Sequence, residues 1–245
     1  MSARKKLLIT GAAGLVGSAL RKYLRDRYDF RLIFHRNVPQ TEPEDEVIVS
    51  DIAAYEEMVE AADGVDAIVH LGIATGGRQR SRYNRMVIET DVGGTYNLFE
   101  AARINKVPTV IYASSNAITG MHESAGLVSR PDLMPRPRDF YGVGKAFGEA
   151  LGRHYHDLFG MSVYCIRICN FPNTDTVNCE YEPGMNRWLS SRDMAELTAC
   201  CLEAPHSGFG IFYGVSKGGE KKYDISNAKE LVGWEPQDRG AESAG

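Results

Sequence analysis

Residues 7–24 of the chain read LLITGAAGLVGSALRKYL, and the pattern of this stretch changes halfway along it. Leu7 to Ile9 form an uninterrupted apolar run, which is typical of a strand covered on both faces in a parallel sheet. Beyond the glycines the apolar residues recur at helical spacing, at Leu15, Val16, Ala19, Leu20, Tyr23 and Leu24. The stretch therefore predicts a strand, a glycine-rich turn and an amphipathic helix in direct succession.

A glycine turn that opens a helix is suited to holding a phosphate. Glycines let the backbone approach a pyrophosphate closely, and the free amides of the helix N-terminus point at it along a favourable dipole. An ordinary tight turn is the alternative, but a turn placed between a strand and a helix favours a dinucleotide site. The spacing is Gly-x-x-Gly-x-x-Gly, and we expect dinucleotide contacts from Gly11, Ala13, Gly14, Leu15, Val16 and Gly17.

The rest of the chain continues this alternation of strands and helices. We expect further strands at 31–35, 47–49, 66–71, 109–113, 163–168 and 211–213, and further helices at 55–62, 83–105, 140–159, 191–203 and 227–232. The alternation predicts an α/β fold, a Rossmann-type doubly wound parallel sheet. We expect that domain to occupy residues 1–168, and residues 169–245 to form a small C-terminal substrate lobe that does not fold independently.

The composition excludes several classes of protein. The chain has 245 residues, 43% of them hydrophobic and 24% charged, as is typical of a soluble globular protein. A formal net charge of −4 argues against binding to nucleic acid, and apolar runs no longer than a strand predict neither a signal peptide nor a membrane span. The five cysteines lack paired metal spacing, so we expect reduced thiols, no metal and a cytoplasmic location.

The end of the second strand indicates which dinucleotide binds. A carboxylate there would bind the adenosine 2′-hydroxyl of NAD, whereas an arginine accommodates the 2′-phosphate of NADP. The chain has His35 and Arg36 at this point and no acidic residue at the strand end. A phosphate beside Arg36 would be paired and would meet no repelling group. We therefore expect NADP, with NAD as the alternative if Arg36 is only a solvated loop residue.

Residues at the other strand ends complete the expected cofactor site. Asp51 follows the third strand and has two equal interpretations, as a partner of the adenine amine or as the cap of the next helix. His70 lies inside a strand and is expected to be a hydrogen-bonded core residue. The small residues after the fourth strand would let the turn lie against the ribose and nicotinamide. The remaining expected cofactor contacts are Ile52, Leu71, Gly72, Ile73, Ala113 and Ile168.

Tyr141 and Lys145 are four residues apart at the start of a predicted helix, so both side chains lie on one face. A phenol with a pKa of about 10 is a poor base at neutral pH, but an adjacent ammonium stabilises the phenolate and lowers that pKa. The hydroxyl of Ser115, at the end of a predicted strand, would hold the substrate oxygen. A Tyr-x-x-x-Lys pair can occur by chance in many chains. Chance is a poor explanation for this pair occurring together with Ser115 and the glycine turn.

These motifs resemble those of the NAD-dependent epimerase/dehydratase family of extended short-chain dehydrogenases/reductases. The resemblance rests on residues 10–17, 114–116 and 141–145, and nearly the whole chain follows the pattern. Several segments are similar to the uronate dehydrogenases, which oxidise the anomeric hydroxyl of hexuronates with NAD: residues 70–72, 113–116, 141–159, 167–168 and 233–236.

The resemblance implies an NAD(P)-dependent oxidoreductase of sugar metabolism, acting on a hydroxyl or carbonyl of a small, sugar-like substrate such as a uronate. A nucleotide-sugar epimerase, dehydratase or 4-keto reductase is the alternative. The implied catalytic residues are Tyr141 as the base, Lys145 as its electrostatic partner and ribose anchor, and Ser115. The implied substrate contacts are Ser115, Asn116, Thr75, Asn170 and Arg187, of which Arg187 is only a possible match for a carboxylate-binding arginine. A homodimer is also implied.

Overall fold

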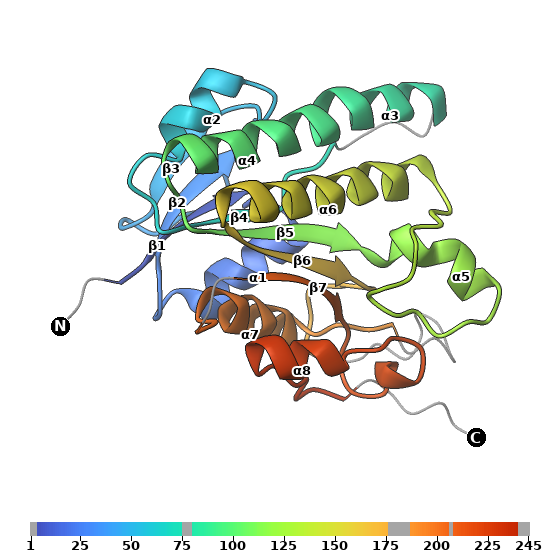
Figure 1. Cartoon of the computed structure of the whole chain (residues 1–245). Coiled ribbons are helices and arrows are strands. Elements are labelled where there is room, and N and C mark those ends of the chain that lie inside the picture. The colour runs from blue at the N-terminus through green and yellow to red at the C-terminus, as the bar shows by residue number, and fades with distance from the viewer. Residues whose placement is uncertain (1–3, 75–79, 176–186, 206–207, 240–245) are drawn as a thin grey trace.

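A seven-stranded, wholly parallel sheet runs through the middle of the molecule in the order β3-β2-β1-β4-β5-β6-β7 (Figure 1). The structure, a computed structural model, describes residues 4–74, 80–175, 187–205 and 208–239. The strands are β1 (Lys6–Thr10), β2 (Asp29–Phe34), β3 (Glu46–Val49), β4 (Ala67–His70), β5 (Thr109–Ser115), β6 (Ser162–Ile168) and β7 (Phe209–Gly214).

Helices cover both faces of this sheet. In Figure 1, α2, α4 and α6 lie above it and α1, α7 and α8 lie below it. The helices of the described residues are α1 (Leu15–Leu24), α2 (Tyr55–Ala61), α3 (Arg80–Met86), α4 (Gly93–Ile104), α5 (Gly120–Ser124), α6 (Phe140–Phe159), α7 (Ser191–Leu202) and α8 (Ser226–Val232). The predicted Rossmann-type doubly wound sheet is confirmed.

The central position of β1 in the sheet explains why its sequence is apolar without interruption. Leu7 and Ile9 point into the core under one face of the sheet, and Leu8 points into the core under the other. All three side chains are fully buried. Because strand side chains alternate between faces, a central strand with a helical layer on each side has no position left for a polar residue.

The sheet order places a ligand crevice beside β1. Strand β1 pairs with β2 on one side and with β4 on the other, so the chain reverses its direction of travel across the sheet there. In open α/β sheets a ligand binds outside the carboxyl ends of the strands at such a point. The glycine turn that follows β1 lies at this position.

The sheet does not end at residue 168, where we expected the first domain to end. Strand β7 pairs with β6 as the seventh strand, and α7 packs against α1 below the sheet. The expected division thus separates residues that share one core, because a short strand and its helix bury their apolar faces best on the existing layers. Residues 215–239 follow the last strand, and α8 among them packs against β7 and adds Ala228 and Val232 to the same core.

The long helix expected at 83–105 is not regular. Helix α3 passes into a π-helical segment, Val87–Val92, and then into α4. A Cβ on Gly94 would lie 2.6 Å from the side chain of Ile52, so the glycine allows the chain to pass close to the turn after β3. A π-helical turn inside a helix often marks a functional site. The short helix α5 lies in a segment for which we expected neither a helix nor a strand.

Candidate active site

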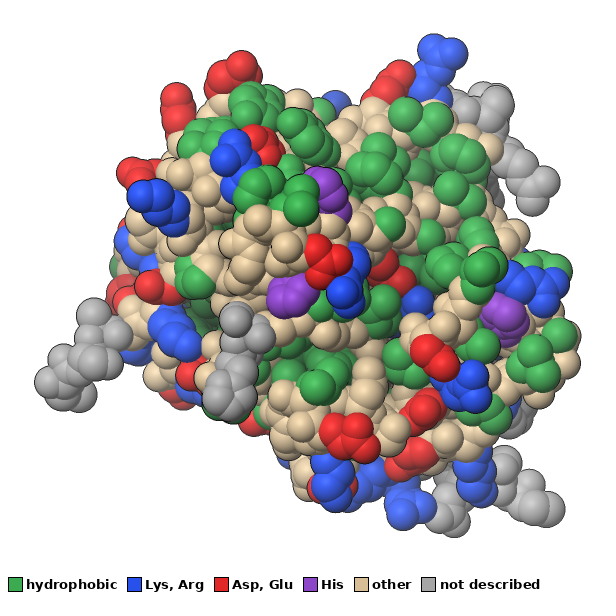
Figure 2. Space-filling view, viewed as in Figure 1, with side chains coloured by type: hydrophobic (Ala, Val, Ile, Leu, Met, Phe, Trp, Pro, Cys, Tyr) green, Lys and Arg blue, Asp and Glu red, His purple; other side chains and the backbone are tan. Residues whose placement is uncertain are grey.

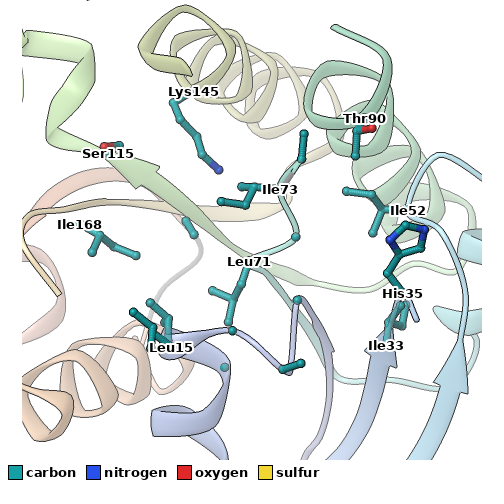
Figure 3. A pocket seen from close by; sticks show the side chains of 18 of the residues that line it. Leu15, Ile33, His35, Ile52, Leu71, Ile73, Thr90, Ser115, Lys145 and Ile168 are labelled. Carbon is teal, nitrogen blue, oxygen red and sulfur yellow. The ribbon is translucent and has the colours of Figure 1, made fainter. Parts of the chain in front are cut away.

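A pocket of about 980 Å³ lies at the carboxyl ends of the strands, around the point where the sheet order reverses. Figure 3 shows Leu15, Leu71 and Ile73 along it, His35 towards one end and Ser115 towards the other. Every residue expected to contact a dinucleotide lines this pocket: Gly11, Ala13, Gly14, Leu15, Val16, Gly17, His35, Arg36, Asp51, Ile52, Leu71, Gly72, Ile73, Ala113, Tyr141, Lys145 and Ile168.

The glycine turn forms a cradle that side chains would fill. Gly11 has φ +65°, and a Cβ there would lie 2.8 Å from the backbone carbon of Leu71. A Cβ on Gly17 would lie 2.7 Å from the Cα of Ala12, so the helix sits directly on the turn. Helix α1 has Gly14 as its N-cap, with no side-chain cap and no acidic residue in its first turn. Its free N–H groups therefore fit the pyrophosphate of a dinucleotide.

Helix α6 and strand β5 bring the three expected catalytic residues to one end of the pocket. Asp139 caps α6 by accepting a hydrogen bond from the backbone N–H of Gly142 at 2.9 Å, which fixes where the helix begins. Tyr141 follows in the first turn and Lys145 one turn later, with Lys145 Nζ 5.7 Å from the centre of the Tyr141 ring. The side chain of Ser115, at the end of β5, lines the same pocket as Tyr141 and accepts a hydrogen bond of 3.1 Å from the backbone N–H of Ala117.

The pKa of Tyr141 differs from our expectation. Burial raises it to about 12, and the lowering effect of the nearby Ser115 side chain opposes this only in part. Lys145 is itself fully buried, and this burial lowers its pKa to about 8. The Lys145 ammonium thus does not lower the pKa of the Tyr141 phenol to near neutral, because burial disfavours the charged form of both side chains.

Asp91 is a neighbour that the sequence did not reveal. It lies in the π-helical segment, is 3% exposed, and accepts a hydrogen bond from the backbone N–H of Ala74. Burial raises the pKa of Asp91, and its negative charge raises the pKa of Lys145. In the sequence, Asp91 is only an acidic residue within a predicted amphipathic helix. A position on the solvent-exposed face of that helix accounts for it equally well.

His70 behaves as a core residue, as expected. Its ring nitrogens lie 2.7 Å from the hydroxyl of Thr10 and 3.1 Å from that of Thr95. Burial, with a smaller effect from Lys145, lowers its pKa to about 3, so the ring is neutral. It ties β1, β4 and α4 together behind the pocket.

The adenosine end of the pocket is less basic than the sequence indicated. His35 Nε2 lies 3.5 Å from Asp51 Oδ2, so an acidic group does stand near the end of β2. It follows the neighbouring strand β3, which is why the residues after β2 alone did not show it. Asp51 also accepts a hydrogen bond from the backbone N–H of Ala53, in the turn ahead of α2, and is not the N-cap of that helix.

The expected substrate residues are only partly brought together. Asn116 lines the pocket beside Ser115, as do Cys169 and Phe171, which were not among the expected substrate contacts. The described lining residues do not include Asn170, which is exposed and pairs with Trp188 in an isolated bridge. Nor do they include Arg187, whose Nε lies 3.6 Å from Glu123 Oε2. Thr75 lies outside the described residues.

A buried ion pair lies behind the expected catalytic residues. Arg167 on β6 donates two hydrogen bonds, of 2.9 and 2.8 Å, to the carboxylate of Glu149 on α6. Glu149 also accepts a hydrogen bond from Ser114, the neighbour of Ser115, at 2.6 Å. The pair therefore fastens the helix that carries Tyr141 to the strands under it. The sequence did not show it, because the partners are 18 residues apart on different elements.

The described residues offer neither a metal-binding cluster nor a membrane-spanning helix. No group of three or more His, Cys, Asp or Glu side chains there is arranged to hold a metal ion. None of the helices in the described ranges is long and apolar enough to cross a membrane.

Comparison with known proteins identifies relatives along most of the chain. The NAD-dependent glucose-6-phosphate dehydrogenase of Haloferax volcanii is 36% identical, over 96% of this chain and 94% of that protein. The uronate dehydrogenase of Agrobacterium fabrum is 32% identical, over 96% and 85%. A solved structure of a mutant uronate dehydrogenase from Agrobacterium tumefaciens, complexed with NAD, superimposes with a TM-score of 0.82 at 30% identity, covering 96% and 86%.

A family model agrees with these relatives and with the geometry of the site. It describes the NAD-dependent epimerase/dehydratase family and matches residues 7–172, from β1 to just beyond β6. The matched residues hold the glycine cradle, the end of β5 and the tyrosine and lysine of α6. This chain therefore belongs to the NAD-dependent epimerase/dehydratase family.

Proposed function

We propose that the protein is an NAD(P)-dependent dehydrogenase that oxidises a hydroxyl group of a small sugar or sugar acid. The observation that carries this proposal is the meeting of Tyr141, Lys145 and Ser115 at one end of a pocket whose other residues form a dinucleotide cradle. The relatives that match most of both chains support it, since they are named as dehydrogenases of glucose 6-phosphate and of uronates.

The residues have distinct roles in this reaction. The nicotinamide of a bound dinucleotide supplies the hydride acceptor and a positive charge. Ser115 holds the reacting hydroxyl by a hydrogen bond, and Tyr141 Oη accepts its proton as the general base. Lys145 stabilises the phenolate electrostatically and is placed to hold the ribose. Because burial raises the pKa of Tyr141 to about 12, the base needs these positive charges at neutral pH.

The same residues would also serve a nucleotide-sugar epimerase, but the relatives favour a dehydrogenase. GDP-mannose 3,5-epimerase of Arabidopsis thaliana is 29% identical, and the match covers only 52% of that protein. The two sugar dehydrogenases match over 85% or more of their own length. These sequence relatives, 32% and 36% identical to the chain, are thus named for a sugar phosphate and for uronates.

We propose NADP as the preferred dinucleotide, with NAD also bound. Arg36 is exposed and lines the pocket just after β2, where a 2′-phosphate on the adenosine ribose would lie. Its guanidinium can pair with that phosphate. The carboxylate of Asp51, near His35, limits the preference, and one relative, the L-arabinose dehydrogenase of Haloferax volcanii, is named for both dinucleotides.

We also propose a homodimer formed through α4 and α6. These helices pack side by side above the sheet, and Figure 2 shows hydrophobic side chains gathered over this part of the surface. On these two helices Val143 and Tyr96 are each 45% exposed, and Phe147 is 37% exposed. Large apolar side chains clustered on neighbouring helices are suited to packing against a second copy of the same face.

The test of the proposed function is a set of initial rates measured by the absorbance of reduced nicotinamide. Glucose 6-phosphate, glucuronate, galacturonate and L-arabinose are each supplied with NAD and with NADP. We expect turnover of at least one sugar with net formation of reduced dinucleotide. Binding of the dinucleotide without net reduction for any of the four would contradict the dehydrogenase proposal and favour an epimerase.

A further inference from the structure

Asn116 is held by a small polar cluster that stands behind it. Its amide nitrogen lies 3.2 and 3.4 Å from the two carboxylate oxygens of Glu123 on α5, and 3.4 Å from the hydroxyl of Tyr223. The Tyr223 hydroxyl donates a hydrogen bond of 3.0 Å to Glu123, and Arg187 Nε lies 3.6 Å from the same carboxylate. Three separate parts of the chain thus converge on one glutamate.

The chemistry of this cluster fixes which way the Asn116 amide faces. A carboxylate can only accept hydrogen bonds, whereas an amide donates through nitrogen and accepts through oxygen. With the Tyr223 hydroxyl also donating to Glu123, only the amide nitrogen of Asn116 is suited to this side. The amide oxygen is therefore the atom left for the other side, where Asn116 lines the pocket next to Ser115.

The cluster is well enough shielded to hold this arrangement. Tyr223 is fully buried, and the side chains of Glu123 and Arg187 are 11% and 22% exposed. Burial, supported by the nearby Cys169 and Glu123 and opposed in part by Arg187, raises the pKa of Tyr223, which keeps its hydroxyl a neutral donor. Arg187, the residue considered as a clamp for a substrate carboxylate, instead faces the negative charge of Glu123.

We propose that Glu123 is a positioning residue that sets substrate specificity by presenting the Asn116 amide oxygen to the pocket. This inference rests on the proposed function and names its substrate class. Because Ser115 and Tyr141 mark the hydroxyl that is oxidised, the adjacent Asn116 accepts a hydrogen bond from the hydroxyl on the neighbouring carbon. The substrate is therefore a vicinal diol. A deoxy carbon there leaves the amide oxygen unpaired, and an anionic group there is repelled.

The test compares the wild type with Glu123→Ala, which releases Asn116, and with Glu230→Ala, which removes an exposed glutamate on α8 as a matched control. The substrates are glucose 6-phosphate and 2-deoxyglucose 6-phosphate, or the corresponding pair for whichever sugar the wild type oxidises. We expect the wild type and Glu230→Ala to favour the 2-hydroxy sugar in kcat/KM by about tenfold or more, and Glu123→Ala to lose most of that preference. Dinucleotide affinity should stay unchanged in all three proteins.

A second measurement reports on Asn116 directly and does not depend on turnover. In NMR spectra of the ¹⁵N-labelled protein, the side-chain amide protons of Asn116 should exchange slowly in the wild type and rapidly in Glu123→Ala. An unchanged sugar preference in Glu123→Ala, or rapid exchange already in the wild type, would overturn the inference. If no sugar is oxidised, the proposed function fails, and the exchange measurement still decides whether Glu123 holds the amide.

Discussion

Lys145 lies where a charged side chain is unfavourable to folding. It is 2% exposed, and its ammonium nitrogen sits 4.9 Å from the ring centre of Tyr112 and 5.7 Å from that of Tyr141. Two ring faces and the negative charge of Asp91 compensate part of the lost hydration, but burial still lowers the pKa to about 8. The site therefore keeps a destabilising charge next to its proposed base.

This lysine makes stability depend on pH in a defined window. Its pKa is about 8 in the folded protein against 10.5 for the free side chain, so between these values the unfolded chain binds more protons. The free energy of unfolding should then rise from pH 8 to 10.5 relative to a Lys145→Met variant, by up to about 3 kcal/mol. Urea unfolding of both proteins across this range measures the difference, and parallel pH curves would contradict it.

Arg36 gives a second prediction at the scale of one residue. Arg36→Ala removes the guanidinium that would pair with a 2′-phosphate, so the Kd for NADPH should rise by about 10- to 100-fold. The Kd for NADH should change by less than about threefold, because the rest of the pocket is untouched. Fluorescence titration with both reduced dinucleotides measures the two values. Equal weakening of both would rule out the phosphate-binding role.

At the scale of elements, α6 is placed by its glycines. A Cβ on Gly148 would lie 2.2 Å from the ring of Tyr112 on β5, and one on Gly152 would lie 2.8 Å from Val163 on β6. The helix can therefore lie close against the sheet, and this close approach sets the height of Tyr141 and Lys145 above Ser115. The buried pair of Glu149 and Arg167 fastens the same helix at its middle.

Gly148→Ala should consequently disturb both stability and catalysis. The added methyl group overlaps the Tyr112 ring, and we expect a loss of about 1–3 kcal/mol in unfolding free energy together with reduced kcat. Gly93→Ala in α4 is the matched control, since a Cβ there meets nothing closer than 3.9 Å. That variant should be unchanged or more stable by up to about 1 kcal/mol. Thermal unfolding of the two variants compares them, and equal stabilities would contradict this account of α6.

The elements were predictable from sequence where one period dominates. The apolar run of β1 and the helical pattern of α1 and α6 marked those elements correctly, because their buried faces repeat at a fixed spacing. The π-helical segment was not predictable, since its widened turn depends on how Gly94 meets Ile52 in the folded chain. The membership of β7 in the main sheet depends likewise on packing, which a six-residue strand does not encode by itself.

At the scale of the whole molecule, the apolar face on α4 and α6 predicts a dimer that a charge should separate. We expect wild-type protein at micromolar concentration to elute as a dimer and Phe147→Glu as a monomer. Leu231→Glu is the matched control, because Leu231 is 54% exposed but lies on α8, below the sheet. Size-exclusion chromatography with light scattering gives the masses. A wild-type monomer, or a Phe147→Glu dimer, would contradict the proposed interface.

The features of the site fall into two groups: those that a local motif predicts, and those that only the fold brings together. The glycine cradle and the pair of Tyr141 and Lys145 could be read from the sequence because each is a local motif. The cluster around Glu123 could not, since Tyr223 stands 100 residues further along the chain and meets it only through the fold. The expectation that Lys145 lowers the pKa of Tyr141 missed the effect of burial for a related reason, because burial is a property of the assembled pocket.

The most direct test of the central claim is the effect of Tyr141→Phe on turnover and on dinucleotide binding, measured separately. The substitution removes only the oxygen that would accept the substrate proton. We predict that kcat falls by about 10²- to 10⁴-fold while the dinucleotide Kd stays within about threefold of the wild-type value. Retention of near wild-type kcat would show that Tyr141 is not the base, and the proposed mechanism would fail.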